Sequence, residues 1–583
     1  MSIEAARRAG YAGEIIGMYK KSGGLSRREW LKQMSVPVVA ASVGSGLIGT
    51  AISSAQTGNA TSHDNSLGAR IYNIRDYGAK GDGSTLDTAG VQAAIDACTK
   101  DQGGTVLVPA GVFVIGTIEL KSNVTLHLAA QGKLLGSADG KQYRAADAIP
   151  LSGDSTLGDG NVGLIYAVNA ENIVIEGPGT IDGQGAQFHS PSRDVLPPAG
   201  ISGNHRPYHL LFHRCNNLTV RDIFLTASAY HSVRIIQSKY VKLDAIRIHN
   251  RVNGNNDGFH FISAQHVHVS NCTVECQDDA CALFGSCKFV TVTNCTFSTR
   301  WSVFRFGGGE AENITVSNCV IYDTFGCPIK MRCGSRSRFE NISFSNLIMK
   351  NVTGPISIGL DSSYRRPPED AASASGKGIV RNISFQGIRA TVVSGRQYAD
   401  MPFPASFRPG ESKSCIALNG VGSDFLEEIS FNNVHVTYEG GGTAEEASIR
   451  DVPQRAGEYF ELGILPAYGL YARNVRGLTL HDVRFEMTAP DLRPAMVFDR
   501  VEDGTINGFS AQGNPAAEAL LRFTNSRDLL FTSPRVLTPS AAFLQLEGET
   551  NERITIDGGD LSRAGAPVKY SRGASERAVR MRT

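Results

Sequence analysis

The feature that most constrains the fold of this chain is a short phrase that returns many times after residue 216. Each copy alternates apolar and polar residues, turns at Asn or Asp, and begins another short strand. Five of the copies are NLTVRDIFL, YVKLDAIRI, HVHVSNCTV, FVTVTNCTF and NITVSNCVI. The apolar residues that open the strands are Leu218, Val241, Val267, Val290, Ile314 and Ile342, and their spacings are 23, 26, 23, 24 and 28. Such a period is typical of a solenoid whose coils stack strand on strand.

Further along the chain the period first lengthens and then shortens. The next strand-opening residues are Ile383, Ile429 and Leu478, at steps of 41, 46 and 49, and short steps follow toward Ile506, Leu530 and Ile554. The long steps contain insertions rich in Pro, Gly and Ser, at roughly 362–380, 395–415 and 437–470. We expect these insertions to be loops that wall a groove, and not separate domains.

The coil length separates this solenoid from other repeat folds. A leucine-rich repeat keeps leucines at fixed offsets, and a propeller needs about four strands in every ~40 residues. A coil of about 23 residues with two or three short strands and no helix fits neither pattern. We therefore predict an all-β fold, a right-handed parallel β-helix over residues 71–560, in which each coil rises by roughly 4.8 Å. The 63 glycines suit such a turn-rich architecture.

The two ends of the predicted solenoid differ in character. Residues 71–100 lead from a strand through a glycine turn to a helix that begins at Asp87 or Thr88 and ends at about Cys98. We expect this segment to cap the open end of the first coil. Residues 561–583 form a basic C-terminal tail.

The first 55 residues resemble a twin-arginine signal peptide. Arg27 and Arg28 precede an apolar run of small residues, and Ser53-Ser54-Ala55 offers a cleavage site. The run is short and glycine-rich for a membrane span, although an uncleaved anchor remains the alternative. We expect a linker at 56–70 and a bacterial protein that is exported to the periplasm or beyond, with no membrane span after processing.

The overall charge predicts neither nucleic acid nor an anionic membrane as a partner. The formal net charge of +1 provides no field for nucleic acid or an anionic membrane. His and Cys show no metal-ligand spacing, and GPGTIDGQG lacks the Lys-Ser/Thr ending of a phosphate loop. We therefore expect no metal and no cofactor, and we expect a monomer.

Three Asn-Cys pairs recur at the coil spacing, namely Asn271-Cys272, Asn294-Cys295 and Asn318-Cys319. We predict that these cysteines stack inside the coils, beside an asparagine ladder along one turn edge. Disulfides are the alternative, and better-placed candidates for them are Cys276 with Cys281 and Cys327 with Cys333.

Three aspartates recur at one coil step. Asp257, in NGNNDGF, lies 21 residues before Asp278 and 22 before Asp279. Taken singly, Asp-Gly is a common turn and Asp-Asp a solvated bend. Brought together on neighbouring coils, the three carboxylates cannot all ionise freely, so at least one pKa should rise. A carboxyl group with a raised pKa beside an ionised carboxylate is the pair of groups that a glycosidase uses.

Cations and histidines follow the aspartates along the chain. Arg300, Arg305 and Lys330 lie one and two coils further on, where they can hold a uronic acid carboxylate or simply neutralise the acidic cluster. His231 and His260 flank the same coils. A lone histidine is more often structural, but His231 is a candidate for binding substrate.

These motifs together resemble glycoside hydrolase family 28, the polygalacturonases and rhamnogalacturonases, over about residues 71–490. The marks are DYGAKGDG, GPGTIDGQG, Arg206-Pro207, NNDG at 255–258, QDD at 277–279 and Ile329-Lys330. The resemblance implies an inverting hydrolase of pectic polysaccharide with Asp278 as general acid. It further implies that Asp257 and Asp279 activate water and that Lys330 binds the substrate carboxylate.

The chain also departs from the family pattern. Trp301-Ser302-Val303 stands where the family usually has Gly-His-Gly, and Pro328 stands where it has Arg. The departures suggest an altered sugar at the cleavage site. Two alternatives stay open: a polysaccharide lyase, which would need calcium and a basic proton acceptor, and a non-catalytic carbohydrate-binding solenoid. The long loops favour action at chain ends over action in chain interiors.

Overall fold

The computed structural model describes residues 68–144, 162–188, 206–361, 377–455 and 459–582, except positions 403, 405, 406, 408 and 409. The expected signal peptide and most of the expected linker lie outside these residues. The described residues belong to one compact unit, Asp64–Thr583. None of its described helices is long and apolar enough to cross a membrane.

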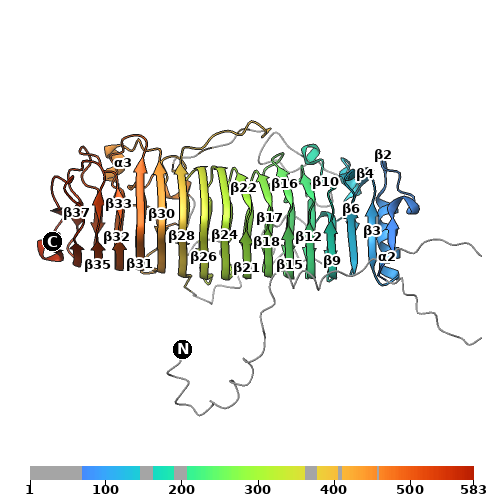
Figure 1. The fold of residues 1–583 in the computed structure, drawn as a ribbon, viewed down its shortest axis with the longest axis horizontal. Coiled ribbons are helices and arrows are strands. Elements are labelled where there is room, and N and C mark those ends of the chain that lie inside the picture. Colours follow the sequence, from blue (N-terminus) through green and yellow to red (C-terminus); the bar gives the residue numbers. More distant parts are fainter. Residues whose placement is uncertain are drawn as a thin grey trace, which may run out of the picture. The chain divides into compact units, whose positions relative to one another are not determined.

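The unit is a right-handed parallel β-helix, as the repeat predicts, and its strands lie side by side along the axis (Figure 1). Every pairing between its strands is parallel, and the strands fall into three sheets.

Sheet 1 carries the first strand of most coils. Its strands are β5 (Ile118–Glu119), β8 (Gly163–Val168), β11 (Tyr208–His213), β14 (Val233–Ile236), β17 (Phe259–Ile262), β20 (Cys281–Phe284), β23 (Phe304–Gly307), β25 (Ile329–Gly334), β27 (Ile356–Asp361), β29 (Ile416–Asn419), β34 (Leu521–Thr524), β37 (Leu544–Glu547) and β39 (Val568–Ser571).

Sheet 2 follows sheet 1 in each coil. Its strands are β1 (Ile71–Asn73), β3 (Gly104–Val108), β6 (Val124–Leu128), β9 (Glu171–Glu176), β12 (Asn216–Arg221), β15 (Lys239–Asp244), β18 (Gln265–Ser270), β21 (Lys288–Thr293), β35 (Arg527–Thr532), β38 (Glu552–Asp557) and β40 (Val579–Arg582).

Sheet 3 completes the coil. Its strands are β2 (Asp82–Leu86), β4 (Gly111–Ile115), β7 (Gly132–Gly136), β10 (Thr180–Asp182), β13 (Phe224–Thr226), β16 (Arg247–Asn250), β19 (Thr273–Cys276), β22 (Thr296–Thr299), β33 (Ser510–Ala511) and β36 (Arg535–Val536). Some strands bend from one sheet into the next, namely β24 (Glu310–Thr324), β26 (Arg338–Val352), β28 (Ile379–Val392), β30 (Leu426–Tyr438), β31 (Leu470–Met487) and β32 (Met496–Asn507).

The repeat also gives the register of sheet 2. The apolar residues from Leu218 to Leu478 that open the repeats pair directly with one another, coil after coil. After Leu478 the expected positions Ile506 and Leu530 are wrong, because the column continues through Gly504 and Leu529, whereas Ile554 is confirmed. Leu530 faces outward and is 38% exposed.

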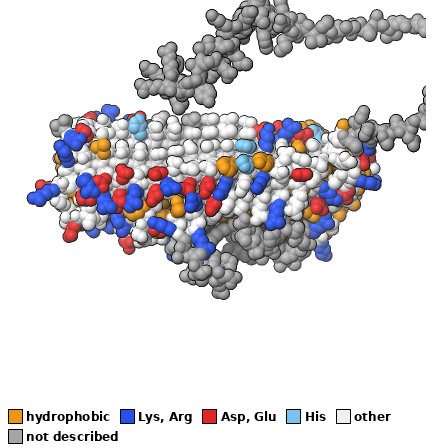
Figure 2. Space-filling model, turned by 90° about the horizontal axis from the view of Figure 1, so that it is seen from below, with side chains coloured by type: hydrophobic (Ala, Val, Ile, Leu, Met, Phe, Trp, Pro, Cys, Tyr) orange, Lys and Arg blue, Asp and Glu red, His pale blue; other side chains and the backbone are white. Residues whose placement is uncertain are grey.

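Inward-facing side chains fill the coil interior, and successive ones stack along the axis. Phe385 stacks on Phe344 and on Phe431, with ring centroids 5.2 and 4.8 Å apart. Each fully buried Val, Leu, Ile or Phe stabilises the fold by about 1.5–3 kcal/mol. On the outside, acidic and basic side chains alternate along one face (Figure 2). Pairs such as Arg221–Glu176 and Arg527–Glu502 bridge neighbouring coils there.

The predicted asparagine ladder is present at the turns after the strands. Asn271, Asn294 and Asn318 all have positive φ, the left-handed conformation that Asn tolerates. Asn346 Nδ2 donates to Asn318 Oδ1 over 3.2 Å, and Asn271 Nδ2 donates to an aspartate of the preceding coil, Asp244.

All eleven cysteines lie in the described residues, and every one is a buried thiol that forms no disulfide. The stack of Cys272, Cys295 and Cys319 is confirmed, and Cys272 N lies 3.4 Å from Cys295 Sγ. The candidate disulfides, Cys276 with Cys281 and Cys327 with Cys333, are not formed. Each of these thiols points to a backbone carbonyl or into the apolar interior instead.

The ends of the unit are closed in different ways. Helix α2 (Thr88–Lys100) follows Asp87 as expected and packs against the first strands with its buried face. The Asp87 carboxylate accepts from the Lys80 and Gly81 N–H groups. At the other end, β39 and β40 extend sheets 1 and 2 into residues 561–583. The remaining short helices are η2 (Ile74–Tyr77), η3 (Gly140–Gln142), η4 (Gly185–Phe188), α3 (Ala444–Ser448), α4 (Tyr459–Leu462) and η7 (Glu576–Ala578).

Candidate active site

Two of the three aspartates occupy equivalent turn positions in neighbouring coils, just before β17 and β20. Gly258 N donates to Asp279 O and Ala280 N donates to Ser302 O, over 2.9 and 2.8 Å. These bonds stack Asp257, Asp279 and Ser302 one coil apart. The one-coil spacing that the sequence predicts is therefore present, and it places two carboxylates at the same edge of sheet 1.

Asp278 and Asp279 point in different directions although they are adjacent. Asp279 is buried, whereas Asp278 is partly exposed. Asp279 N donates to Asp278 Oδ1 over 2.9 Å, and Asn255 Nδ2 donates to Asp278 Oδ2 over 3.3 Å. The turn thus presents one carboxylate toward solvent and keeps the other against the coil.

Burial and mutual repulsion shift the titration of the buried carboxyls. Burial raises the pKa of Asp257 well above its ordinary value, and the charges of Asp278 and Asp279 raise it further. Burial also raises the pKa of Asp279 to about 7, together with Asp278, although Arg305 and Lys330 oppose the rise. The expectation that at least one pKa rises is met at two of the aspartates.

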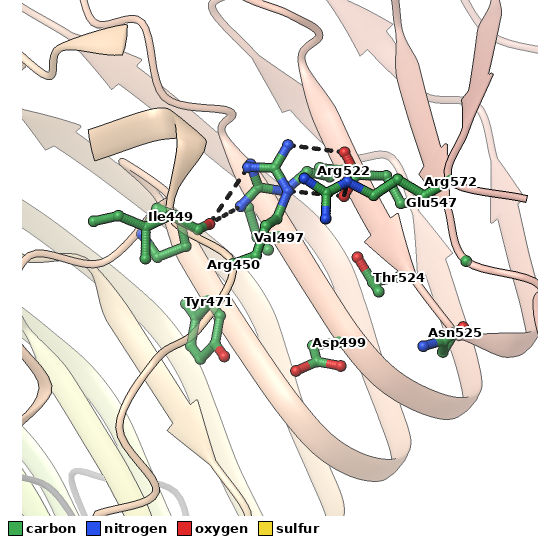
Figure 3. Close-up of a pocket in the computed structure, with 12 residues that line it drawn as sticks. Ile449, Arg450, Tyr471, Val497, Asp499, Arg522, Thr524, Asn525, Glu547 and Arg572 are labelled. Atoms are coloured by element: carbon green, nitrogen blue, oxygen red, sulfur yellow. Dashed lines mark hydrogen bonds and ion pairs between the residues drawn. The ribbon is translucent and has the colours of Figure 1, made fainter. Parts of the chain in front are cut away.

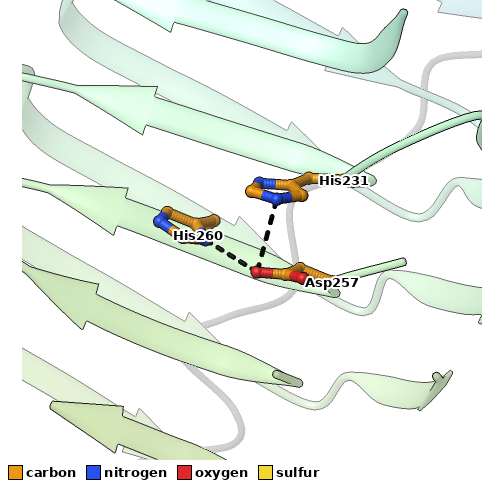
Figure 4. Close-up of side chains that lie close together, drawn as sticks. All are labelled: His231, Asp257 and His260. Atoms are coloured by element: carbon orange, nitrogen blue, oxygen red, sulfur yellow. Dashed lines mark hydrogen bonds and ion pairs between the residues drawn. The ribbon is translucent and has the colours of Figure 1, made fainter. Parts of the chain in front are cut away.

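Two histidines contact Asp257 (Figure 4). His260 Nδ1 and Asp257 Oδ2 are hydrogen-bonded over 2.7 Å, and His231 Nε2 lies 3.6 Å from the same oxygen. All three side chains are buried. Burial lowers the pKa of His231 well below its ordinary value. Sequence spacing alone gave neither histidine a partner. His231 lies a full coil away from Asp257 in the chain, and only the stacking of neighbouring coils brings the two together.

Within the described residues, His231, Asp257 and His260 are the group close enough to hold a metal ion. The two imidazole rings are stacked, with centroids 4.5 Å apart and an angle of 20° between their planes. Lone pairs in nearly parallel rings do not converge on one point, whereas a metal ion needs ligands that do. The arrangement therefore suits hydrogen bonding to Asp257 better than metal ligation.

Two arginines of earlier coils also face Asp257, and sequence reasoning assigned neither of them a role there. The charges of Arg234 and Arg206 oppose the rise in the pKa of Asp257. Arg234 is fully buried and donates to the Tyr208 hydroxyl. Arg206 lies over the Tyr230 ring at 4.2 Å from its centroid. The guanidinium groups of Arg234 and Arg206 therefore place positive charge next to the acidic cluster.

Arg305 and Lys330 lie on the outward face of sheet 1, next to Asp279. They are direct partners in the register of β23 and β25, and both are buried. Their charges lower the pKa of Asp279, so both cations act on the cluster. Lys330 Nζ lies 4.3 Å from the centroid of the Trp301 ring. Trp301, which departs from the family pattern, therefore contacts the lysine directly.

Arg300 makes different contacts. Its guanidinium donates to Phe325 O over 3.0 Å and lies 3.4 Å from the Glu411 carboxylate, and both charged side chains are buried. These contacts are to Phe325, just after β24, and to Glu411, in the insertion at 395–415.

Two of the inserted segments contact residues next to the site. Arg332 pairs with Glu461 over 2.9 Å, and the Phe460 ring lies 6.1 Å from that of Trp301. Tyr459 anchors helix α4 by donating to backbone carbonyls of β27 and of Cys415. These contacts place described parts of the insertion at 437–470 next to the site, and the groove that such loops are expected to wall stays a prediction. The insertion at 362–376 lies outside the described residues.

Comparison with known proteins places the chain in one family. The family model described as "Glycosyl hydrolases family 28" matches residues 98–402, more than half of the chain. A polygalacturonase of Malus domestica is 27% identical over 342 residues, which cover 56% of this chain and 70% of that protein. The exo-poly-alpha-D-galacturonosidase of Dickeya chrysanthemi is 30% identical over 254 residues, which cover 36% of this chain and 41% of that protein.

Solved structures share the fold. The exopolygalacturonase from Thermotoga maritima has a TM-score of 0.55 and 19% identity, over 72% of this chain and 92% of that one. The family 28 exopolygalacturonase of Yersinia enterocolitica also has a TM-score of 0.55 and 19% identity, over 75% of this chain and 78% of that one. Because the family model spans more than half of the chain, this protein belongs to glycosyl hydrolases family 28 and is a glycoside hydrolase that acts on O-glycosyl bonds.

Proposed function

We propose that this protein cleaves the glycosidic bonds of a pectic or related acidic polysaccharide by inversion, with Asp257, Asp278 and Asp279 as its catalytic residues. The observation that carries the proposal is the one-coil stacking of the buried Asp257 and Asp279 beside the partly exposed Asp278. An inverting glycosidase needs one carboxyl to protonate the leaving oxygen and another to activate water on the opposite side of the bond.

The degree of exposure supports the choice of the acid. Asp278 is partly exposed whereas Asp257 and Asp279 are buried, so a glycosidic oxygen that arrives from solvent would meet Asp278 first. In the proposed reaction Asp278 gives its proton to the leaving oxygen as the glycosidic bond breaks. Asn255, which donates to Asp278 Oδ2, holds that carboxyl in place.

The buried pair supplies the base. A carboxylate is a better proton acceptor when its pKa lies near the working pH, and the pKa of Asp279 is about 7. Asp257 and Asp279 together take the proton of the attacking water, whose oxygen forms the new bond to the sugar. His260 and His231 hold the Asp257 carboxylate in one orientation.

The cations support an acidic substrate. Lys330 and Arg305 act electrostatically on Asp279 and lie next to it on sheet 1. A substrate carboxylate placed above the same edge would receive charge-assisted hydrogen bonds from them. The relatives named polygalacturonase and exo-poly-alpha-D-galacturonosidase point to a galacturonate polymer. Helix α4 and its contacts at Trp301 favour cleavage at chain ends.

The same proposal includes export. The Arg27-Arg28 pair and the apolar run after it would carry the folded enzyme across the inner membrane, where plant polysaccharide is accessible. A fusion of residues 1–55 to a reporter that needs twin-arginine transport tests this part, with Arg27→Lys and Arg28→Lys as the paired change that should abolish transport.

Product analysis tests the reaction. The full chain and its Asp278→Asn variant are incubated with homogalacturonan, rhamnogalacturonan and their oligosaccharides, and new reducing ends and unsaturated uronate absorbance are recorded together. We expect saturated products whose formation falls by at least about 10²-fold in the variant. Anomeric configuration of the first product, followed by NMR, tests inversion.

A matched variant controls for changes in charge. Asp222→Asn, at an exposed turn of sheet 2, should leave turnover unchanged. Unsaturated products would indicate a lyase, and binding without any product would indicate a carbohydrate-binding solenoid. Equal turnover by Asp278→Asn would remove Asp278 from the mechanism.

A further inference from the structure

A second polar cavity lies on the same outward face of sheet 1, in coils that the family model does not reach. Its volume is about 280 Å³. Arg522 of β34 lines it, and Arg522 belongs to the same register column as Lys330, five coils away. At one strand spacing per coil this separation is roughly 24 Å. The family match ends at residue 402, and all residues that line this cavity follow it in the chain.

Three arginines line the cavity (Figure 3). Arg450 holds both oxygens of Glu547 over 2.8 Å. Arg522 is 1% exposed, donates through both Nη atoms to Ala447 O and Ile449 O, and leaves its buried Nε without a hydrogen-bond partner. Arg572 is more than half exposed, 3.7 Å from Glu547. Arg450 therefore takes both oxygens of Glu547 and also donates to Glu518 over 3.1 Å. Arg572 approaches Glu547 less closely, and Arg522 approaches a carboxylate only at 4.0 Å, from Glu518.

The two carboxyls of the cavity differ. Burial raises the pKa of Glu547, but the hydrogen bonds and charge of Arg450 outweigh this effect and lower it overall. Asp499 has no such partner at hydrogen-bond distance, since the nearest guanidinium nitrogen is Arg500 Nε at 3.9 Å, and burial raises its pKa. Three arginines and two carboxyls line the cavity, so the lining residues carry an excess of positive charge.

The remaining lining suits a hydroxylated ring. Thr524 and Asn525 offer a hydroxyl and an amide, and Asp499 offers a carboxyl oxygen, while Tyr471 and Val497 provide an apolar wall. Sites that enclose drug-sized ligands start at about 300 Å³, so this cavity admits one sugar residue and not a polymer segment. A guanidinium group that is not already paired with a carboxylate can bind one through two parallel N–H···O hydrogen bonds.

The inserted segment from α3 to α4 separates this cavity from the active site. At one end of the segment Glu461 pairs with Arg332 beside the catalytic coils, and at the other end Ile449 and Arg450 line the cavity. The two sites therefore lie on opposite sides of one inserted segment.

We propose that this cavity is a second saccharide site, which binds a single uronic acid residue through Arg522 and Arg572 and its hydroxyls through Asp499, Thr524 and Asn525. The choice of a uronic acid over other small carboxylates rests on the proposed function. The ligand would be a free monosaccharide, such as a released product, or the end of a short acidic oligosaccharide.

Calorimetry on the full chain tests the site with D-galacturonate as the probe and D-galactose as its neutral counterpart. The measurements use the Lys330→Met variant, which weakens uronate binding at the active site. We expect galacturonate to bind and galactose not to bind. Arg572→Gln should weaken binding about tenfold, because a charge-assisted hydrogen bond is lost. Thr524→Phe, which fills the cavity, should abolish binding.

Arg527→Gln is the matched control, because Arg527 is an exposed arginine of sheet 2 that pairs with Glu502. Hydrolysis of a short oligosaccharide by Arg572→Gln and Thr524→Phe in the otherwise wild-type chain should equal that of the unmodified enzyme. Equal binding of galactose, or affinity unmoved by both cavity variants, would overturn the proposal. If the unmodified enzyme hydrolyses no uronate-containing substrate but the cavity still binds galacturonate, the proposed function is overturned and the second site stands.

Discussion

His260 Nδ1 lies 2.7 Å from Asp257 Oδ2, and both side chains are buried, so imidazole and carboxylate share a hydrogen bond that water does not reach. The ring of His260 is fixed by stacking on His231 and on Phe284, with centroids 4.5 and 5.0 Å away. Packing of rings from three coils thus fixes the direction of one carboxylate.

Replacing His260 by Phe tests this relationship, since Phe keeps the ring stack and removes the hydrogen bond. We expect kcat to fall roughly 10²-fold with little change in KM. Loss of a donor to the carboxylate also raises the pKa of Asp257 further, so the acidic limb of the kcat/KM profile should move to higher pH. Steady-state kinetics from pH 4 to 8 measures both effects.

His266→Phe is the control for His260. His266 is stacked in the same way, between Tyr240 and Phe289 at 4.9 Å from each, and contacts neither Asp257 nor Asp279. The His266→Phe variant should leave kcat and the pH profile unchanged. An unshifted profile in His260→Phe would limit His260 to a packing role.

The pKa of Asp279 leads to a prediction about stability. The folded value of about 7 lies above the ordinary 3.8, so between these values the folded protein holds a proton that the unfolded chain has released. The free energy of unfolding therefore falls as pH rises through this window, and the loss is complete above about pH 7. Each unit of pKa difference corresponds to about 1.4 kcal/mol.

Asp279→Asn removes the titrating group and keeps its shape. We expect the variant to be more stable than wild type by a few kcal/mol at pH 8, with the difference vanishing below pH 4. Urea unfolding at both pH values measures it. A variant that is less stable than wild type at pH 8 would show that the Asp279 carboxylate stabilises the fold.

The buried pair of Arg300 and Glu411 predicts a coupled effect. Removing one partner takes an opposite charge away from the other buried side chain, and such a change costs up to about 3–5 kcal/mol. We expect Arg300→Met and Glu411→Leu each to be strongly destabilised, and the double variant to recover most of the loss. Thermal unfolding of the four proteins gives the coupling energy.

Limited proteolysis extends the same test to the loop. Cleavage near Glu411 should be faster in each single variant than in the double variant. If the losses of the two single variants simply add in the double variant, the pair is not coupled.

The cysteines provide a prediction about redox behaviour. Because all eleven are buried thiols outside disulfides, a thiol reagent should label eleven groups in denaturant and almost none in the native protein. A reductant should not change the melting temperature. Fewer than eleven reactive thiols in denaturant, measured on protein purified without reductant, would indicate disulfides.

Much of the fold follows from the repeats, and the limit of that prediction has a physical cause. From Leu218 to Leu478 an apolar residue occupies the column position in every coil and a second apolar residue follows two positions later, so the same register repeats. Beyond Leu478, Gly504 and Ile506 both lie on the inner face, and Leu529 is adjacent to Leu530. Since side chains alternate with a period of two, apolar character alone cannot choose between such positions.

The sequence by itself determined the coil architecture, the cap helix, the cysteine stack and the one-coil step between Asp257 and Asp279, because these depend on periodicity. Only the tertiary structure decided what each side chain contacts. It turned Arg300 toward Glu411, brought His231 and His260 onto Asp257, and left Asp278 partly exposed beside a buried Asp279. The physical reason is that such contacts join coils and inserted loops far apart in the chain, whose distances and burial no local spacing fixes.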